Sequence, residues 1–294
     1  MGFPPSHETF FGFAEGPFSL TPDPKYYFRS RSHSRVFEAL SAGVANRESV
    51  LLVTGDLGVG KTTLCRTLMD LLQCKTRVAM VGNALISPED LLRRLLQDLG
   101  GVSKEEVSSG RLAGATPAEL NELLGAFLSS QDGSRGGVVL IVDEAQSLPP
   151  ATVEQIIALV SMDANRDKSL QIVLAGQPAV GGGPGVPKAI DQLLTTRTRL
   201  LPLERDECDR YIAHRLAIAG GAGVVFDARA IEVIYALSGG VARLVNLLCV
   251  HGLQQAAAAK ATRVAAVMIE SAASAFELGR LRPKRFRWYG SQAR

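Results

Sequence analysis

The sequence contains, at residues 50–63, the stretch Val50-Leu-Leu-Val-Thr-Gly55-Asp-Leu-Gly-Val-Gly60-Lys61-Thr62-Thr63. Its first four residues are apolar, which is typical of a strand buried on both faces of a parallel sheet. They lead into the spacing Gly55-x-x-x-x-Gly60-Lys61-Thr62, and a helical pattern follows from residue 64. Glycines let backbone N–H groups turn toward a polyphosphate, and the next helix adds its positive N-terminal end. The stretch therefore predicts a P-loop (Walker A) that binds a nucleoside triphosphate.

The side chains of this loop have separate predicted tasks. Lys61 can reach the β- and γ-phosphates, and the Thr62 hydroxyl can bind Mg²⁺. A glycine-rich surface turn is the weaker alternative, because eight positions fit the motif and both flanks have the expected pattern. The predicted cofactors are ATP and Mg²⁺. The residues expected to bind them here are Gly55, Gly58, Val59, Gly60, Lys61, Thr62 and Thr63.

A second apolar run, at residues 137–142, ends in two adjacent carboxylates, Asp143 and Glu144. Beside a P-loop this pair is the Walker B arrangement, in which the first carboxylate holds Mg²⁺ and the second activates the attacking water. A solvated strand end explains one carboxylate but is the weaker explanation for two. We therefore predict Asp143 as a metal ligand and Glu144 as a catalytic residue.

The remaining periodicity divides the chain. Apolar runs at 78–81 and 170–175 and a short segment at 197–203 predict further strands, with helices between them. From residue 206 four helical patterns follow, at 206–219, 227–237, 241–259 and 262–278. We expect an α/β domain with a parallel sheet and then a small all-helical lid. The predicted divisions are an arm at 1–33, the α/β domain at 34–204, the lid at 205–278 and a basic tail at 279–294.

Several polar residues outside the two motifs are candidates for the same site. Gln177 follows the 170–175 strand, where it either senses hydrolysis of the γ-phosphate or caps a turn. Arg243 begins the third lid helix against the helix dipole, and a bound phosphate would be a suitable partner. Arg197 and Arg199 either complete a neighbouring subunit's site as an arginine finger or are solvated.

The Phe- and Pro-rich residues 1–24 predict an arm without a regular helix. Phe10, Phe11, Phe13 and Phe18 make it too apolar for a free tail, so we expect it to pack on the α/β domain. Covering the nucleotide base and simple core packing are equally good explanations of such an arm.

Composition limits the other function classes. The net charge is +3, but residues 280–294 carry six basic residues and no acid, which leaves 26 basic and 29 acidic residues in the body. The body therefore has no general attraction for nucleic acid. The four cysteines lack metal-binding spacing, and neither an 18-residue apolar run nor a secretory signal is present. We expect a cytoplasmic protein without a transmembrane span.

With these motifs located, the chain resembles the AAA+ superfamily and, more narrowly, the general secretion pathway protein A (ExeA-like) ATPases. The resemblance covers about residues 8–260. Beyond the P-loop, it rests on Gly16-Pro-Phe-Ser-Leu-Thr-Pro-Asp-Pro24, Ser30 and His33, Asp143-Glu-Ala-Gln146, Gln171-Ile-Val-Leu-Ala-Gly-Gln-Pro178, and Ser238-Gly-Gly-Val-Ala-Arg243-Leu-Val-Asn246.

The resemblance implies a five-stranded parallel sheet between helices, a C-terminal helical lid, and a homo-oligomer, either ring or dimer, that hydrolyses Mg-ATP at subunit interfaces. It gives Gln177 the sensor 1 position and Arg243 the sensor 2 position. Ala242 replaces the proline that the family usually has before that arginine. After Gly-Gln-Pro the family has a charged helix and a Gln-Arg-Ile element, where this chain has a glycine-rich loop and Leu193-Leu-Thr-Thr-Arg197. Arg197 or Arg199 takes the finger role, or that role is weakened.

Three functions follow as hypotheses. The leading one is an ATPase whose nucleotide-driven assembly drives or regulates a partner. Secretion or cell-envelope machinery is the candidate partner, with a peripheral inner-membrane location as an option. The second is a DNA-binding AAA+ regulator of the transposition type. The third is a nucleotide-gated scaffold with little turnover. The segment 280–289 suits a membrane surface, a nucleic-acid-binding arm or a solvated tail.

Overall fold

The computed structural model describes residues 6–74, 76–102, 112, 114–130, 137–164, 169–178, 187–221 and 225–275. The chain divides into two compact units. One is Pro22–Leu201, and the other combines Met1–Thr21 with Pro202–Arg294. The first is called the α/β unit below, and the second the helical unit.

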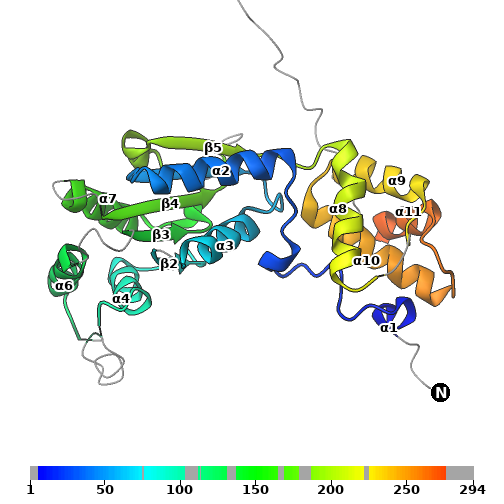
Figure 1. The fold of residues 1–294 in the computed structure, drawn as a ribbon, viewed down its shortest axis with the longest axis horizontal. Coiled ribbons are helices and arrows are strands. Elements are labelled where there is room, and N and C mark those ends of the chain that lie inside the picture. The colour runs from blue at the N-terminus through cyan, green and yellow to red at the C-terminus, as the bar shows by residue number, and fades with distance from the viewer. Residues whose placement is uncertain are drawn as a thin grey trace, which may run out of the picture. The chain divides into compact units, whose positions relative to one another are not determined.

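The α/β unit is built on a parallel sheet of five strands in the order β2-β3-β4-β1-β5 (Figure 1). The strands are β1 (Val50–Gly55), β2 (Arg77–Val81), β3 (Val138–Val142), β4 (Leu170–Gly176) and β5 (Thr196–Leu200). Every residue of β3 and β4 is buried, as expected for β3, which is apolar throughout, and for β4, which is apolar except for Gln171. The predicted fold class is confirmed. Because β3, β4 and β1 are neighbours, their carboxyl ends meet at one edge, where ligands bind in open parallel sheets.

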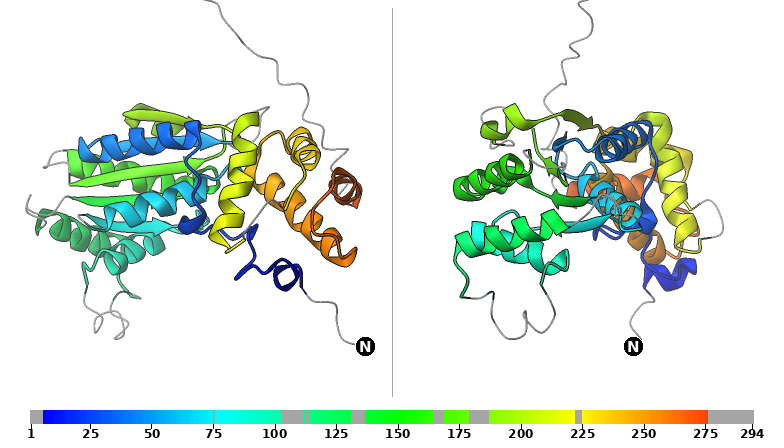
Figure 2. Two further views of the ribbon diagram at one scale, coloured as in Figure 1. Left: turned by 45° about the vertical axis from the view of Figure 1, so that its right-hand side comes forward. Right: turned by 60° about the vertical axis from the view of Figure 1, so that its left-hand side comes forward.

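Helices cover both faces of this sheet, because alternate residues of each strand point to opposite sides. Helices α2 (Arg31–Ala45) and α3 (Lys61–Leu72) pack on one face, and α4 (Pro88–Asp98), α6 (Pro117–Ser130) and α7 (Pro150–Ala164) pack on the other. Figure 2 shows this layering from two further sides. Three short 3₁₀ turns complete the unit: η1 (Pro24–Tyr26), η2 (Ala145–Ser147) and η3 (Lys188–Leu193).

The helical unit contains α8 (Arg205–Ile218), α9 (Ala228–Ser238), α10 (Ala242–Ala258) and α11 (Ala266–Ala275). A capping box of Glu204 and Glu207 fixes the start of α8, and Gly239 in the left-handed conformation ends α9. The prediction of four helices in this part of the chain is confirmed. Within the described residues, no helix is long and apolar enough to cross a membrane. The predicted basic tail lies outside the described residues.

The N-terminal arm differs from its prediction in two ways. A five-residue helix, α1 (His7–Phe11), forms in the proline-free part and ends at Gly12 with positive φ. The arm also packs within the helical unit. The Phe18 ring, fully buried, meets Phe226 edge to face at 5.9 Å between centroids. Four apolar side chains in the arm predict burial, but they do not indicate which unit buries them.

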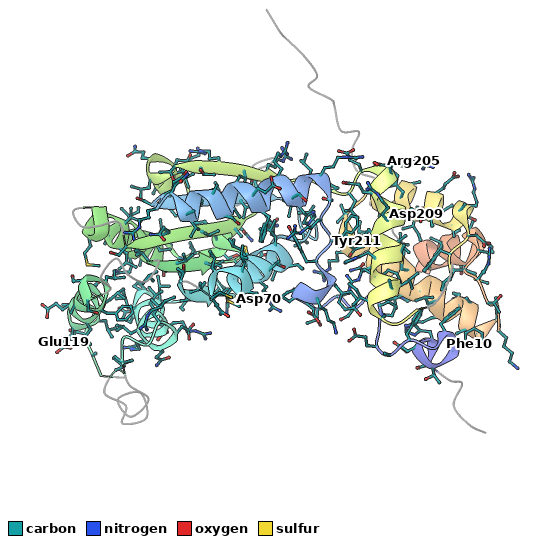
Figure 3. The ribbon with its side chains drawn as sticks, in the orientation of Figure 1. Phe10, Asp70, Glu119, Arg205, Asp209 and Tyr211 are labelled. Atoms are coloured by element: carbon teal, nitrogen blue, oxygen red, sulfur yellow. The ribbon has the colours of Figure 1, made fainter. Side chains whose placement is uncertain are left out.

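A buried arginine of α8 holds the arm in place. The Arg215 guanidinium, 6% exposed, donates to the carbonyls of Pro17 (2.6 Å) and Ser19 (3.2 Å). It also donates to the Tyr211 hydroxyl at 3.0 Å, and that hydroxyl in turn donates to Asn246 Oδ1 at 2.8 Å. Tyr211 is labelled on α8 in Figure 3. After residue 21 the chain enters the α/β unit, where Arg66 of α3 donates to the Pro22 carbonyl.

Candidate nucleotide site

The loop between β1 and α3 has the backbone that its glycines predict. Gly58 and Gly60 have φ values of 81° and 110°, which favour glycine. A Cβ on Gly55 would lie 2.8 Å from the Leu200 carbonyl oxygen, so β5 closes against the start of the loop. A Cβ on Gly60 would lie 2.9 Å from His33 Nε2. Glycine is therefore required at residue 60 for two reasons: its backbone has positive φ, and His33 leaves no room for a Cβ.

The His33 ring lies against Gly60 and is itself held at several points. The Ser30 hydroxyl caps α2 by accepting from the His33 N–H (3.2 Å) and contacts His33 Nδ1 at 2.7 Å. The Tyr27 hydroxyl donates to the His33 carbonyl at 3.2 Å, and the two rings meet edge to face. Sequence reasoning identified Ser30 and His33 only as part of a family pattern. Their support of the P-loop depends on the packing of α2, which the local sequence does not reveal.

Lys61, the first residue of α3, is 4% exposed and lies within the loop. Its ammonium donates to the carbonyls of Gly55 (2.9 Å) and Asp56 (3.1 Å). Burial lowers the Lys61 pKa, and the nearby carboxylates of Glu144, Asp143 and Asp56 oppose that shift. The loop thus presents a buried ammonium beside the N-terminus of α3, an arrangement suited to a phosphate.

The P-loop and the end of β3 are joined by one hydrogen bond. The Thr62 hydroxyl donates to Asp143 Oδ2 at 2.5 Å. Asp143 is 3% exposed, and burial raises its pKa, although the bonds from Thr62 and from the Glu144 N–H favour the ionised form. A hydroxyl and a carboxylate oxygen at this spacing are the hard ligands that Mg²⁺ prefers, so the residues fit that ion. No cluster of three or more His, Cys, Asp or Glu residues able to hold a metal occurs in the part of the chain that the structure describes.

Glu144 adopts the left-handed conformation, with φ 52° and ψ 37°, which is uncommon outside glycine and costs backbone energy. It turns the chain from β3 into η2, whose Gln146 side chain folds back. Gln146 Nε2 donates to Glu144 Oε2, and Gln146 Oε1 accepts from the Gln177 backbone N–H at 3.0 Å. The α/β unit therefore brings Lys61, Thr62 and the adjacent carboxylates together with the end of β4. Gln146 was missed as a site residue, although it is next to the Walker B pair.

Comparison with known proteins supports the same interpretation. Residues 45–180 match a family described as the AAA domain. The chain is 33% identical over 246 residues to general secretion pathway protein A of Aeromonas hydrophila, covering 83% of this chain and 44% of that protein. The chain belongs to the AAA+ family. It is related to general secretion pathway protein A and spans less than half of that relative's length.

Solved structures show the same fold at low identity. The Aeropyrum pernix ORC2 protein, in its ADPNP-ADP complexes, superposes with a TM-score of 0.67 and 17% identity, covering 89% of this AAA+ chain and 71% of ORC2. Cdc6p from Pyrobaculum aerophilum superposes with a TM-score of 0.67 and 16% identity, covering 88% of this chain and 70% of Cdc6p. The Thermotoga maritima RuvB Holliday junction branch migration motor superposes with a TM-score of 0.53 and 19% identity, covering 83% of this chain and 68% of RuvB. These matches show the fold alone and carry no argument about partners.

The other predicted site residues of this AAA+ chain make no side-chain hydrogen bond or ion pair with the Walker A and Walker B residues among the residues that the structure describes. The Gln177 side chain is half-buried and makes no hydrogen bond among the described residues, so the contact with the site comes from its backbone. Arg197 and Arg199 are exposed on the edge strand β5, and Arg197 pairs with Asp191 at 3.4 Å. Arg243 is exposed in the first turn of α10, in the helical unit.

Proposed function

We propose that this chain binds Mg-ATP at the P-loop and hydrolyses it to ADP and phosphate. The observation that carries the proposal is the Thr62–Asp143 hydrogen bond. It joins the phosphate loop to the end of β3 and places a hard-ligand pair next to Glu144. A glycine-rich turn without a ligand would not need a buried lysine, a buried aspartate and a left-handed glutamate in one place.

Each residue has a proposed role. The loop N–H groups of Gly55–Thr63 and the Lys61 ammonium bind the phosphates, and Thr62 with Asp143 holds Mg²⁺, which when bound neutralises developing phosphate charge. Glu144 accepts a proton from the attacking water. Gln177 and Arg243 report the state of the γ-phosphate, and Arg197 or Arg199 acts as a finger in a neighbouring subunit's site. The roles of these four residues extend the proposal beyond the central group.

We further propose that nucleotide-dependent self-association drives or regulates a partner machine. The relationship to general secretion pathway protein A supports a role in secretion or envelope assembly, at the cytoplasmic face of the inner membrane. A DNA-binding regulator is the second candidate function. The basic segment 280–294 supports it, because six cationic side chains and two adjacent aromatic residues are also suited to binding a nucleic acid.

The first experiment measures ATP binding by the whole chain with a fluorescent ATP analogue and Mg²⁺. Replacing the Lys61 ammonium with an apolar side chain of similar length (Lys61→Met) removes a charged hydrogen-bond donor, so affinity should fall about 10- to 100-fold. Lys25→Met is the matched control, since Lys25 is exposed and pairs only weakly with Asp23 at 3.6 Å. Equal affinity of wild type and Lys61→Met would contradict the proposed site.

A second experiment separates the partner hypotheses. The full chain and a chain ending at residue 279 are tested against duplex DNA and against vesicles containing anionic lipid, over a range of salt concentrations. Salt-sensitive DNA binding that requires residues 280–294 would favour the DNA-binding regulator. Vesicle binding that requires them would favour work at a membrane surface. In parallel, light scattering with and without Mg-ATP tests self-association.

A further inference from the structure

The Gln146 side chain links the ends of two neighbouring strands. Through Nε2 it holds one oxygen of the Glu144 carboxylate, which follows β3. Through Oε1 it accepts the backbone N–H of Gln177, which follows β4. Both bonds lie within the α/β unit, and β4 lies between β3 and the strand that leads into the P-loop.

The chemistry of the two partners determines the orientation of the Gln146 amide. A backbone N–H can only donate, so the amide atom facing Gln177 has to be the oxygen. An ionised carboxylate can only accept, so the atom facing Glu144 has to be the nitrogen. The side chain therefore has one orientation that satisfies both ends, and the Glu144 carboxylate is held with one oxygen occupied.

The Glu144 carboxylate needs this hydrogen bond because the Glu144 backbone does little to fix the orientation of its side chain. Glu144 is a non-glycine residue with φ 52°, two positions after the end of β3, and its N–H already donates to Asp143 Oδ1 at 2.9 Å. A half-buried glutamate side chain has several free torsions, and a base that samples several rotamers is seldom aligned with its water. The hydrogen bond from Gln146 selects one rotamer of Glu144. Because Gln146 is also bonded to the Gln177 backbone, that rotamer is fixed relative to the end of β4.

We propose that Gln146 is a positioning residue for hydrolysis: it sets the orientation of the Glu144 carboxylate and couples it to the end of β4 at Gln177. This inference rests on the proposed ATPase function. It predicts that any movement of the β4 end, such as one caused by a change at the γ-phosphate, displaces the base through a single side chain. The free oxygen of Glu144 remains available to the attacking water.

The test compares steady-state ATP hydrolysis and ATP-analogue binding by the whole chain with two changes at Gln146. Gln146→Met keeps the length of the side chain and removes both hydrogen bonds. Gln146→Glu keeps an oxygen that can accept from the Gln177 N–H, but in its ionised form it has no hydrogen to donate to Glu144 and its charge repels that carboxylate. Both variants should lower kcat about 10- to 100-fold, the effect of a misplaced catalytic group, while KM and the dissociation constant change less than about 3-fold.

Gln155→Met is the matched control. Gln155 on α7 also exchanges amide hydrogen bonds with a second polar side chain, Asn121 (2.9 and 3.4 Å), on α6. It should leave kcat unchanged, and melting curves show whether each variant folds. An unchanged kcat in Gln146→Glu, or an equal loss of binding and turnover in both variants, overturns the inference. Wild-type protein without turnover would instead overturn the proposed function itself.

Discussion

Replacing Arg215 should release the N-terminal arm from the helical unit. Its guanidinium makes three hydrogen bonds, to the Pro17 carbonyl, the Ser19 carbonyl and the Tyr211 hydroxyl. The side chain also lies 5.9 Å from the centre of the Phe18 ring. Because the group is buried, Arg215→Met keeps the volume of the stem but leaves two carbonyls without their donor. At about 1.5 kcal/mol for each of these two hydrogen bonds from a charged group to the arm, the loss is about 3 kcal/mol.

Hydrogen exchange of the arm measures this loss locally. The Ala14 N–H donates to the Ala219 carbonyl at 2.9 Å, so it exchanges only when the arm opens. A loss of about 3 kcal/mol corresponds to about 150-fold faster exchange at that amide. Arg210→Met on the same helix is the control, because Arg210 is exposed and, among the described residues, bonds only Asp206 one turn away. Exchange at Ala14 within tenfold of wild type would refute the role given to Arg215.

Two further changes test the nucleotide site. Gly60→Ala should lower both the melting temperature and ATP affinity, since it strains a residue with φ 110° by roughly 1–3 kcal/mol and meets His33 Nε2. Gly82→Ala, where no atom lies within 4 Å of the new Cβ, should change neither, and an equal effect of the two would contradict the packing argument. Asp143→Asn should raise the melting temperature at neutral pH. Burial raises the Asp143 pKa, so the stability linked to this group is present at low pH and is lost as pH rises through the raised pKa. The same variant should lose Mg²⁺-dependent ATP binding. A lower melting temperature, or a stability difference that does not grow as pH rises from the ordinary carboxyl pKa through the raised pKa of Asp143, would count against this.

Most of the fold could be predicted because its signals are local. The runs 50–53 and 138–142 are apolar without interruption, which is typical of strands buried on both faces. The P-loop spacing and the Asp143–Glu144 pair could be assigned for the same reason: each motif places its ligands within a few residues. The carboxyl ends of parallel strands then bring the two motifs to one edge of the sheet, and the Thr62–Asp143 bond confirms that they meet.

The features that sequence reasoning missed depend on contacts between distant segments. Phe18 is apolar wherever it packs, and only the structure shows that its ring contacts Phe226 and the Arg215 guanidinium. His33 lies in an ordinary amphipathic helix, and its place behind Gly60 depends on how α2 crosses the sheet. Gln146 was visible beside the Walker B pair, but its partner at Gln177 is brought near only by the pairing of β3 with β4.

The central claim is that Glu144 activates water for hydrolysis of ATP bound at the P-loop. Phosphate release from Mg-ATP by the whole chain tests it, with wild type and Glu144→Gln compared at equal occupancy by ATP. The Gln side chain has nearly the same shape but cannot accept the proton, so turnover should fall roughly 100-fold or more while ATP binding persists. Equal rates of phosphate release from the two proteins would contradict the account.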